Sequence, residues 1–162
     1  MRRLTFAIVV AGVAFSCSGG FEPEENDGGG DGGPTTVGCS ADPRVVVAAP
    51  GVTVPVSGSP LSLQIVSTTP APPARGTNAW VVRLTSTEPG AEAAAQVAEV
   101  TPTMPDHGHG SSVKPTLFRR PDGDYEIGSL SLVMPGVWTI AFRIQQGDGT
   151  QATATVSICI AG

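Results

Sequence analysis

The chain has 162 residues, with 9 Lys or Arg and 14 Asp or Glu, which gives a formal net charge of −5 at pH 7. Without Arg2 and Arg3 the balance is 7 basic residues against 14 acidic ones, and the largest basic cluster is the pair Arg119 and Arg120. Such a chain repels polyanions, so its composition excludes nucleic acid as a partner.

Residues 1–16 have the pattern of an export signal. Two arginines come first, and a run of about a dozen mostly apolar residues follows, which is too short for a membrane-spanning helix. The next phrase, Ala-Phe-Ser-Cys, resembles a bacterial lipobox, although Leu is commoner at its first place and Phe15 is large for its second. We therefore expect acylation of Cys17, which would hold the protein on a membrane of the cell envelope, facing the periplasm or the exterior. The alternative is an ordinary secretory signal that leaves Cys17 as an odd thiol.

Residues 17–38 are glycine-rich and acidic, and residues 39–162 remain as one domain. The first segment is predicted to be a flexible tether, because it cannot bury enough apolar surface to offset the entropy of ordering it. Cys39 and Cys159 bracket the domain, and export to an oxidising space favours a disulfide between them. A pair of metal thiolates is the less favoured alternative, because the sequence lacks Cys-x-x-Cys spacing.

Apolar and polar residues alternate along much of the domain, which predicts strands rather than helices. Residues 90–97 are the exception, where a short helical turn and a strand are both compatible with the sequence. The faces expected in the core are Trp80, Val82 and Leu84, then Trp138, Ile140, Phe142 and Ile144, then Ala154, Val156, Ile158 and Ile160, with further strands at 44–47, 62–67 and 125–134.

Turn signals separate these runs. Asp122-Gly123 and Asp148-Gly149 predict hairpin turns. The apolar positions are odd-numbered at Tyr125 and Ile127 but even-numbered over 130–134. This change of alternation near Gly128 predicts a β-bulge. The sequence therefore predicts an all-β, immunoglobulin-like antiparallel sandwich of about seven to eight strands.

Residues 104–110 (Met-Pro-Asp-His-Gly-His-Gly) contain both histidines of the chain. The prolines and glycines predict a loop, and in an extended stretch His107 and His109 would point to the same side. Met104 would join them if the chain bends after it. Met134 precedes a Pro-Gly turn, and it would face them if the two loops share one end of the sandwich.

Imidazole and thioether ligands together suit copper, above all Cu(I). Zinc is less favoured because it rarely uses thioether, although Asp106 would offer a His-Asp-His alternative. In a second reading the histidines are solvated and the methionines fill the core, so the domain is a structural or interaction module without a metal. We do not expect an enzyme, because the acidic residues at 122, 124 and 126 surround a turn, where solvated carboxylates are the default.

Several phrases in a fixed order resemble a known family. They are residues 76–84, 104–110, 122–125 (Asp-Gly-Asp-Tyr) and 132–138 (Leu-Val-Met-Pro-Gly-Val-Trp). Together they are similar to the YtkA-like domain, related to the FixH-like domain, over about 76–144. The resemblance implies an exported or membrane-attached immunoglobulin-like sandwich, often a lipoprotein, with a link to copper handling. It implies Met104, His107, His109 and, less directly, Met134 as ligands, and a copper acceptor such as an oxidase subunit as partner.

Overall fold

The computed structural model describes residues 39–162, which belong to one compact unit. The predictions for the signal at 1–16, for Cys17 and for the tether at 17–38 fall outside these residues. Within the described range, no helix is long and apolar enough to cross a membrane.

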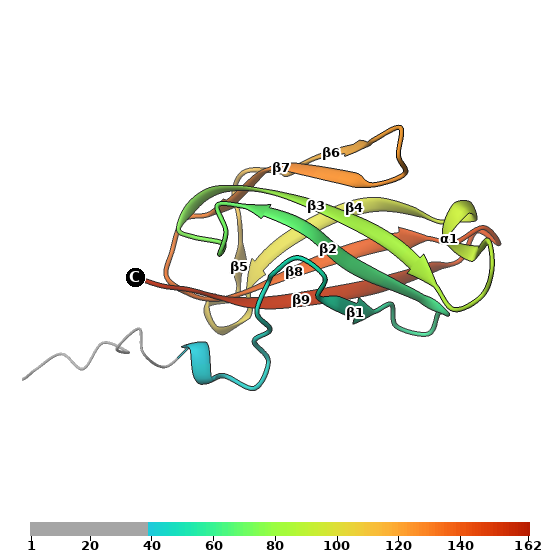
Figure 1. Cartoon of the computed structure of the whole chain (residues 1–162). Helices are drawn as coiled ribbons and strands as arrows, with labels where there is room; N and C mark the ends of the chain where they lie inside the picture. Colours follow the sequence, from blue (N-terminus) through green and yellow to red (C-terminus); the bar gives the residue numbers. More distant parts are fainter. Residues whose placement is uncertain (1–38) are drawn as a thin grey trace, which may run out of the picture. The chain divides into compact units, whose positions relative to one another are not determined.

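Two antiparallel sheets pack face to face as a sandwich (Figure 1). One sheet has the strand order β1-β2-β3-β7-β6 and the other has the order β5-β4-β8-β9. The elements are η1 (Cys39–Ala41), β1 (Thr53–Pro55), β2 (Leu61–Thr69), β3 (Gly76–Ser86), α1 (Ala91–Ala94), β4 (Gln96–Met104), η2 (Pro105–His107), β5 (His109–Gly110), β6 (Thr116–Arg119), β7 (Tyr125–Leu132), β8 (Gly136–Gln145) and β9 (Gln151–Ile160).

The strand order is that of the immunoglobulin fold. Strands β2-β3-β7-β6 take the A-B-E-D places, and β5-β4-β8-β9 take the C′-C-F-G places. The predicted immunoglobulin-like sandwich is therefore confirmed. Residues 39–162 contain nine strands rather than seven or eight, because the short strands β1 and β5 gave no alternating pattern long enough to detect.

The predicted strand at 44–47 is wrong. The N–H of Val45 donates to the carbonyl of Asp42 at 2.9 Å, and the N–H of Ala49 donates to the carbonyl of Val47 at 2.9 Å. These local turns take up amides that a strand ladder would need. The N–H of Val46 does reach the carbonyl of Ser157 on β9, at 2.8 Å, so the segment lies along that sheet without joining it.

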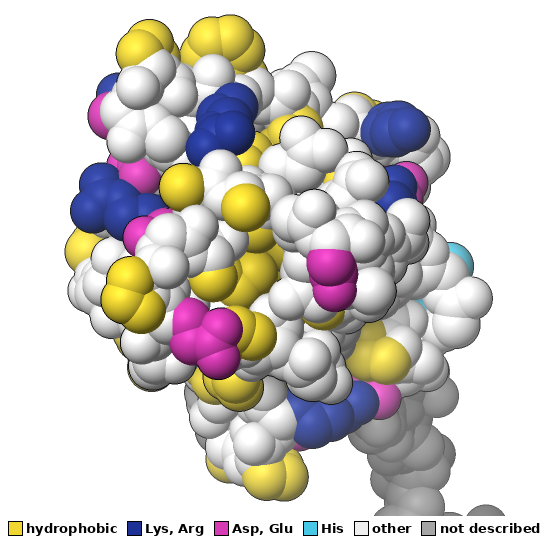
Figure 2. All heavy atoms as spheres, turned by 90° about the vertical axis from the view of Figure 1, so that its right-hand side faces the viewer, with side chains coloured by type: hydrophobic (Ala, Val, Ile, Leu, Met, Phe, Trp, Pro, Cys, Tyr) yellow, Lys and Arg dark blue, Asp and Glu magenta, His cyan; other side chains and the backbone are white. Residues whose placement is uncertain are grey.

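The sandwich has two distinct ends (Figure 1). At one end lie η1, the η2–β5 turn and the C-terminus. At the other lie α1 and the β6–β7 and β8–β9 turns, and Figure 2 looks onto this end. The alternatives at 90–97 are resolved there, because α1 forms one helical turn and β4 begins at Gln96.

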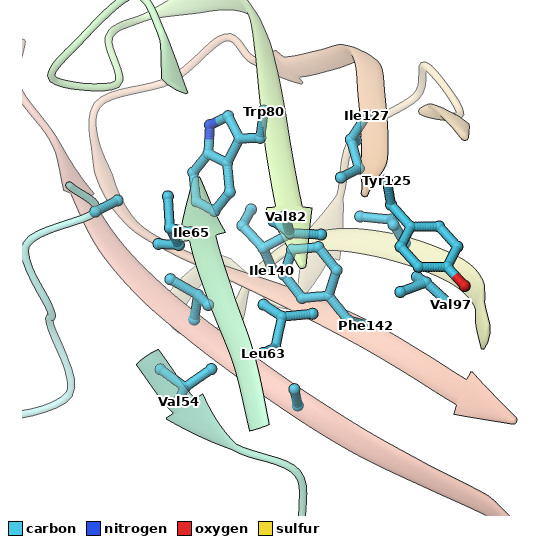
Figure 3. Close-up of a cluster of buried hydrophobic side chains, with 14 of the residues drawn as sticks. Val54, Leu63, Ile65, Trp80, Val82, Val97, Tyr125, Ile127, Ile140 and Phe142 are labelled. Carbon is cyan, nitrogen blue, oxygen red and sulfur yellow. The ribbon is translucent and has the colours of Figure 1, made fainter. Parts of the chain in front are cut away.

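The core lies between the two sheets, as the alternation predicted (Figure 3). The side chains expected on the inner faces of β3, β8 and β9 are all buried. The rings of Trp80 and Phe142 stack across the core, with centroids 6.4 Å apart. These two aromatic side chains therefore belong to the core and do not line a ligand pocket.

The bulge expected near Gly128 is present in β7. Asn78 pairs with Leu130 and Trp80 pairs with Ile127, so β7 carries one more residue than β3 between these two pairs. Ser129 takes up the irregularity with a positive φ of 54°. The extra residue turns Leu130 inward together with Ile127, which is why Leu130 and Leu132 are buried as well as Tyr125 and Ile127.

The predicted disulfide between Cys39 and Cys159 is confirmed. Their Cα atoms are 5.4 Å apart, and 120 residues separate them in sequence. The bond ties η1 to β9. Closure of a loop this long would stabilise the fold by roughly 4–5 kcal/mol in the chain-entropy model.

Candidate functional site

Residues 104–110 form a tight turn at the end of β4. Pro105–His107 is a 3-10 turn, and Gly108 follows in the left-handed region with a φ of 67°. The N–H of Gly108 donates to the carbonyl of Met104 at 3.0 Å. The chain then pairs back on β4, with His109 opposite Met104. The predicted loop is therefore present as a tight turn, because glycine at position 108 permits the reversal, and His107 and His109 do not lie in one extended stretch.

The turn holds the two imidazoles together at the surface. Both histidines are exposed, and their ring centroids are 5.8 Å apart with an angle of 56° between the ring planes. Nδ1 of His109 lies 3.3 Å from the carbonyl oxygen of Gly110, which leaves Nε2 facing away from that contact. Solvent can therefore reach both imidazoles of the predicted ligand set.

Met104 lies in the core rather than at the surface. Its side chain is 1 % exposed. Its methyl carbon packs so closely on Gly136 that a Cβ at position 136 would lie 3.0 Å from it. The structure therefore brings the 104–110 turn and the start of β8 together at one end of the sandwich. The thioether faces inward there, as in the alternative reading of methionine as a core filler.

Met134 lies in the turn between β7 and β8, at the same end. Strand β7 stops at Leu132, so the predicted parity with Leu130 and Leu132 does not extend to Met134, which is 38 % exposed. Its carbonyl accepts a hydrogen bond from the indole N–H of Trp138 at 2.9 Å. The indole therefore fixes the backbone of this turn and leaves the thioether at the surface.

Asp106 is held by an arginine from the N-terminal segment. Arg44 donates to both carboxylate oxygens of Asp106, at 2.9 and 2.8 Å, and also to both oxygens of Asp42, at 2.9 and 2.6 Å. Hydrogen bonds from Arg44 lower the pKa of Asp42 to about 2 and lower the pKa of Asp106 as well. The same bonds, those to Asp42 first, raise the pKa of Arg44. Asp106 is thus already paired in this structure.

The ligand set of the turn is small. Within residues 39–162, no group of three His, Cys, Asp or Glu side chains is placed to hold a metal ion. A His-Asp-His zinc site would have to take Asp106 away from Arg44. Of the predicted copper ligands, the two imidazoles are exposed, the thioether of Met134 lies at the surface, and the thioether of Met104 is buried.

One acidic residue of the β6–β7 turn is not solvated, contrary to the expectation from the sequence. Asp124 is 2 % exposed, and its carboxylate accepts hydrogen bonds from Nε and Nη2 of Arg83 at 2.6 and 2.8 Å. This contact raises the pKa of Arg83. The pairing depends on the register of β3 against β7, for which the turn sequence itself carries no signal.

Comparisons of the chain with protein-family models, with curated proteins and with solved structures gave no match. The resemblance to the YtkA-like domain stays a prediction that depends on the phrases quoted above. The function is therefore inferred from the geometry of the chain itself.

Proposed function

We propose that this chain is an exported, lipid-anchored protein that binds copper at the 104–110 turn and delivers it to an acceptor in the cell envelope. The observation that carries the proposal is the exposed pair of imidazoles of His107 and His109, 5.8 Å apart between ring centroids. Imidazole nitrogen binds Cu(II) well, and a thioether added to it favours Cu(I).

An open and incomplete ligand set suits delivery better than storage. A site closed on all sides by its own protein has to be dismantled before the ion can leave. Here both imidazoles and Met134 face solvent, so ligands from an acceptor protein can approach the same ion. An oxidase subunit that receives copper is one such acceptor.

The lipid anchor is proposed from the sequence of the first 17 residues. An acylated Cys17 followed by a glycine-rich, acidic segment would place the sandwich close to a bilayer while leaving it free to meet partners. The protein would then face the periplasm or the exterior. Globomycin treatment of an expressing bacterium, which blocks lipoprotein signal cleavage, should raise the apparent mass of the protein if the anchor is present.

The decisive experiment is titration of the protein, purified with Cys17→Ser and without its signal, with Cu(I) and with Cu(II). We expect one equivalent bound with a Kd below about 1 μM, and loss of this binding in His107→Ala/His109→Ala. Ser112→Ala, an exposed residue next to the same turn, is the control. Binding weaker than micromolar, or binding unchanged in the double variant, would reject the copper proposal.

A second candidate is a structural or interaction module without a metal. It is favoured by the burial of Met104 and by the engagement of Asp106 with Arg44, both of which give the turn an architectural role. In that case His107→Ala/His109→Ala would keep its fold and bind no less copper than the parent protein. A loss of thermal stability in this variant, measured in the presence of a chelator, would also indicate an architectural turn.

A further inference from the structure

A second candidate site is lined in part by α1, which lies at the opposite end of the sandwich from the η2–β5 turn that carries the histidines (Figure 1). A cavity of about 280 Å³ opens there between α1, the end of β3 and the β6–β7 turn. Figure 2 looks onto this end and shows acidic and basic side chains around an apolar hollow. Arg119 and Ala93 line this cavity and also a neighbouring one next to the β8–β9 turn. In the immunoglobulin fold this end carries the B–C, D–E and F–G connections.

Most charged groups around the cavity already have partners. Arg83 and Asp124 form the two-bonded ion pair described above. Asp122 accepts a hydrogen bond from the N–H of Asp124 at 3.1 Å and lies 3.8 Å from Nε of Arg120. The hydroxyl of Tyr125 donates to the carbonyl of Ala95 at 3.4 Å. These groups form the wall of the cavity and have little capacity left for a ligand.

Two groups of opposite charge remain. Oε2 of Glu92 is buried and has no hydrogen-bond partner among the described residues. The guanidinium of Arg119 lies over the ring of Tyr125, 5.6 Å from its centroid, and forms no ion pair with any carboxylate of residues 39–162. A buried carboxylate oxygen without a donor is costly, and in a native protein it calls for an explanation.

We propose that this cavity binds a small zwitterion, a free amino acid or a compound of the same kind. Its ammonium group would donate to Glu92, its carboxylate would accept from Arg119, and its side chain would rest on the apolar floor that Leu84 and the ring of Tyr125 provide. A ligand with one charge would leave the other group unsatisfied. The volume sets the size limit, since it lies just below the range of roughly 300–1,000 Å³ typical of pockets for drug-sized ligands.

The test is a titration of the metal-free protein, purified with Cys17→Ser and followed by ¹H–¹⁵N NMR, with alanine and with glutamine as probes. N-acetylalanine and alaninamide serve as matched compounds that each lack one of the two charges. We expect the amides of α1 and of residues 119–125 to shift with the free amino acids, and much less with either blocked compound. Amides of the 104–110 turn should not move, which separates this site from the proposed copper site.

Variants then test the two charges. Glu92→Gln and Arg119→Gln should each weaken binding by at least about tenfold, the effect of one lost charge-assisted hydrogen bond. Glu126→Gln, exposed on β7, and Arg75→Gln, at the other end of the sandwich, make the same charge changes and should leave binding unchanged. No shift at millimolar amino acid, or equal binding of the blocked compounds, would overturn the proposal. A change in the side-chain NMR signal of Arg119 in the ligand-free Glu92→Gln variant would also overturn the proposal, because it would show that Glu92 and Arg119 already interact with each other.

Discussion

Arg44 forms a two-bonded ion pair with Asp106, which lies 62 residues away in the sequence. Its Nη1 and Nη2 atoms donate to the two carboxylate oxygens of Asp106. The pair connects the segment that follows η1 to the turn that carries the histidines. It therefore fixes the residue directly before His107 by a contact from outside its own sheet. The same guanidinium holds Asp42, so three side chains form one exposed network.

Because of this network, the free energy of unfolding should decrease as the pH falls through the acid range. The pKa values of Asp42 and Asp106 are lowered in the folded protein, to about 2 for Asp42. Against an unfolded value of about 3.9, their contribution is complete above about pH 4 and is lost as the pH falls towards 2. The melting temperature of the parent should exceed that of Arg44→Ala near neutral pH, and the two should converge by about pH 2.

Arg75→Ala is the control for this prediction, because Arg75 donates to the carbonyl of Val133, which does not titrate. The difference in melting temperature between Arg75→Ala and the parent should stay constant over the same pH range. If the difference in melting temperature between Arg44→Ala and the parent also stayed constant down to about pH 2, the pH dependence would not come from Asp42 and Asp106.

Gly136→Ala should destabilise the fold at the site end. Gly136 has a φ of 126°, which a side chain disfavours, and a new Cβ would lie 3.0 Å from the methyl carbon of Met104. We expect a loss of about 1–2 kcal/mol in the free energy of unfolding from the backbone alone, measured by urea denaturation. Gly123→Ala, with a φ of 90° and open space around its Cβ, isolates the backbone contribution. If both variants lose the same amount, the contact with Met104 is unimportant.

Substitution of Met104 and of Met134 by leucine distinguishes a role in the core from a role in binding copper. Met104→Leu keeps the apolar volume of a buried side chain and should cost less than about 1.5 kcal/mol. Met134→Leu alters an exposed side chain and should hardly change stability. If copper uses the sulfur at the surface, Met134→Leu should weaken Cu(I) binding more than Met104→Leu does, with Cu(II) binding changed little in both. A larger effect from Met104→Leu would mean that the turn repacks on binding the ion.

Arg83→Met should be more harmful than its exposed position suggests. It leaves the carboxylate of Asp124, which is 2 % exposed, without its two hydrogen bonds. An unsatisfied buried acceptor costs about 1–3 kcal/mol, and more when it is charged. Arg83→Met/Asp124→Asn should recover part of this loss in thermal or urea unfolding, because the charge that needed a partner is gone. A double variant less stable than Arg83→Met would show that Asp124 has another essential contact.

The strands could be predicted because their signal is local. Alternation with a period of two identifies a buried face wherever a strand is long, as in β3, β8 and β9, and a change of parity reveals the bulge at Ser129. The same reasoning missed β1 and β5, which are too short to alternate. It also placed a strand at 44–47, where apolar residues lie along β9 without joining its ladder.

The sequence by itself determined the immunoglobulin-like sandwich, its inner faces and the disulfide between Cys39 and Cys159. Only the tertiary structure decided the content of the candidate site. Met104 and Met134 have the same chemistry, yet one fills the core and the other lies at the surface, because their positions relative to the strand ends differ. The partners of Asp106 and Asp124 come from residues 62 and 41 positions away, and such contacts follow from strand pairing and chain path, which local sequence does not encode.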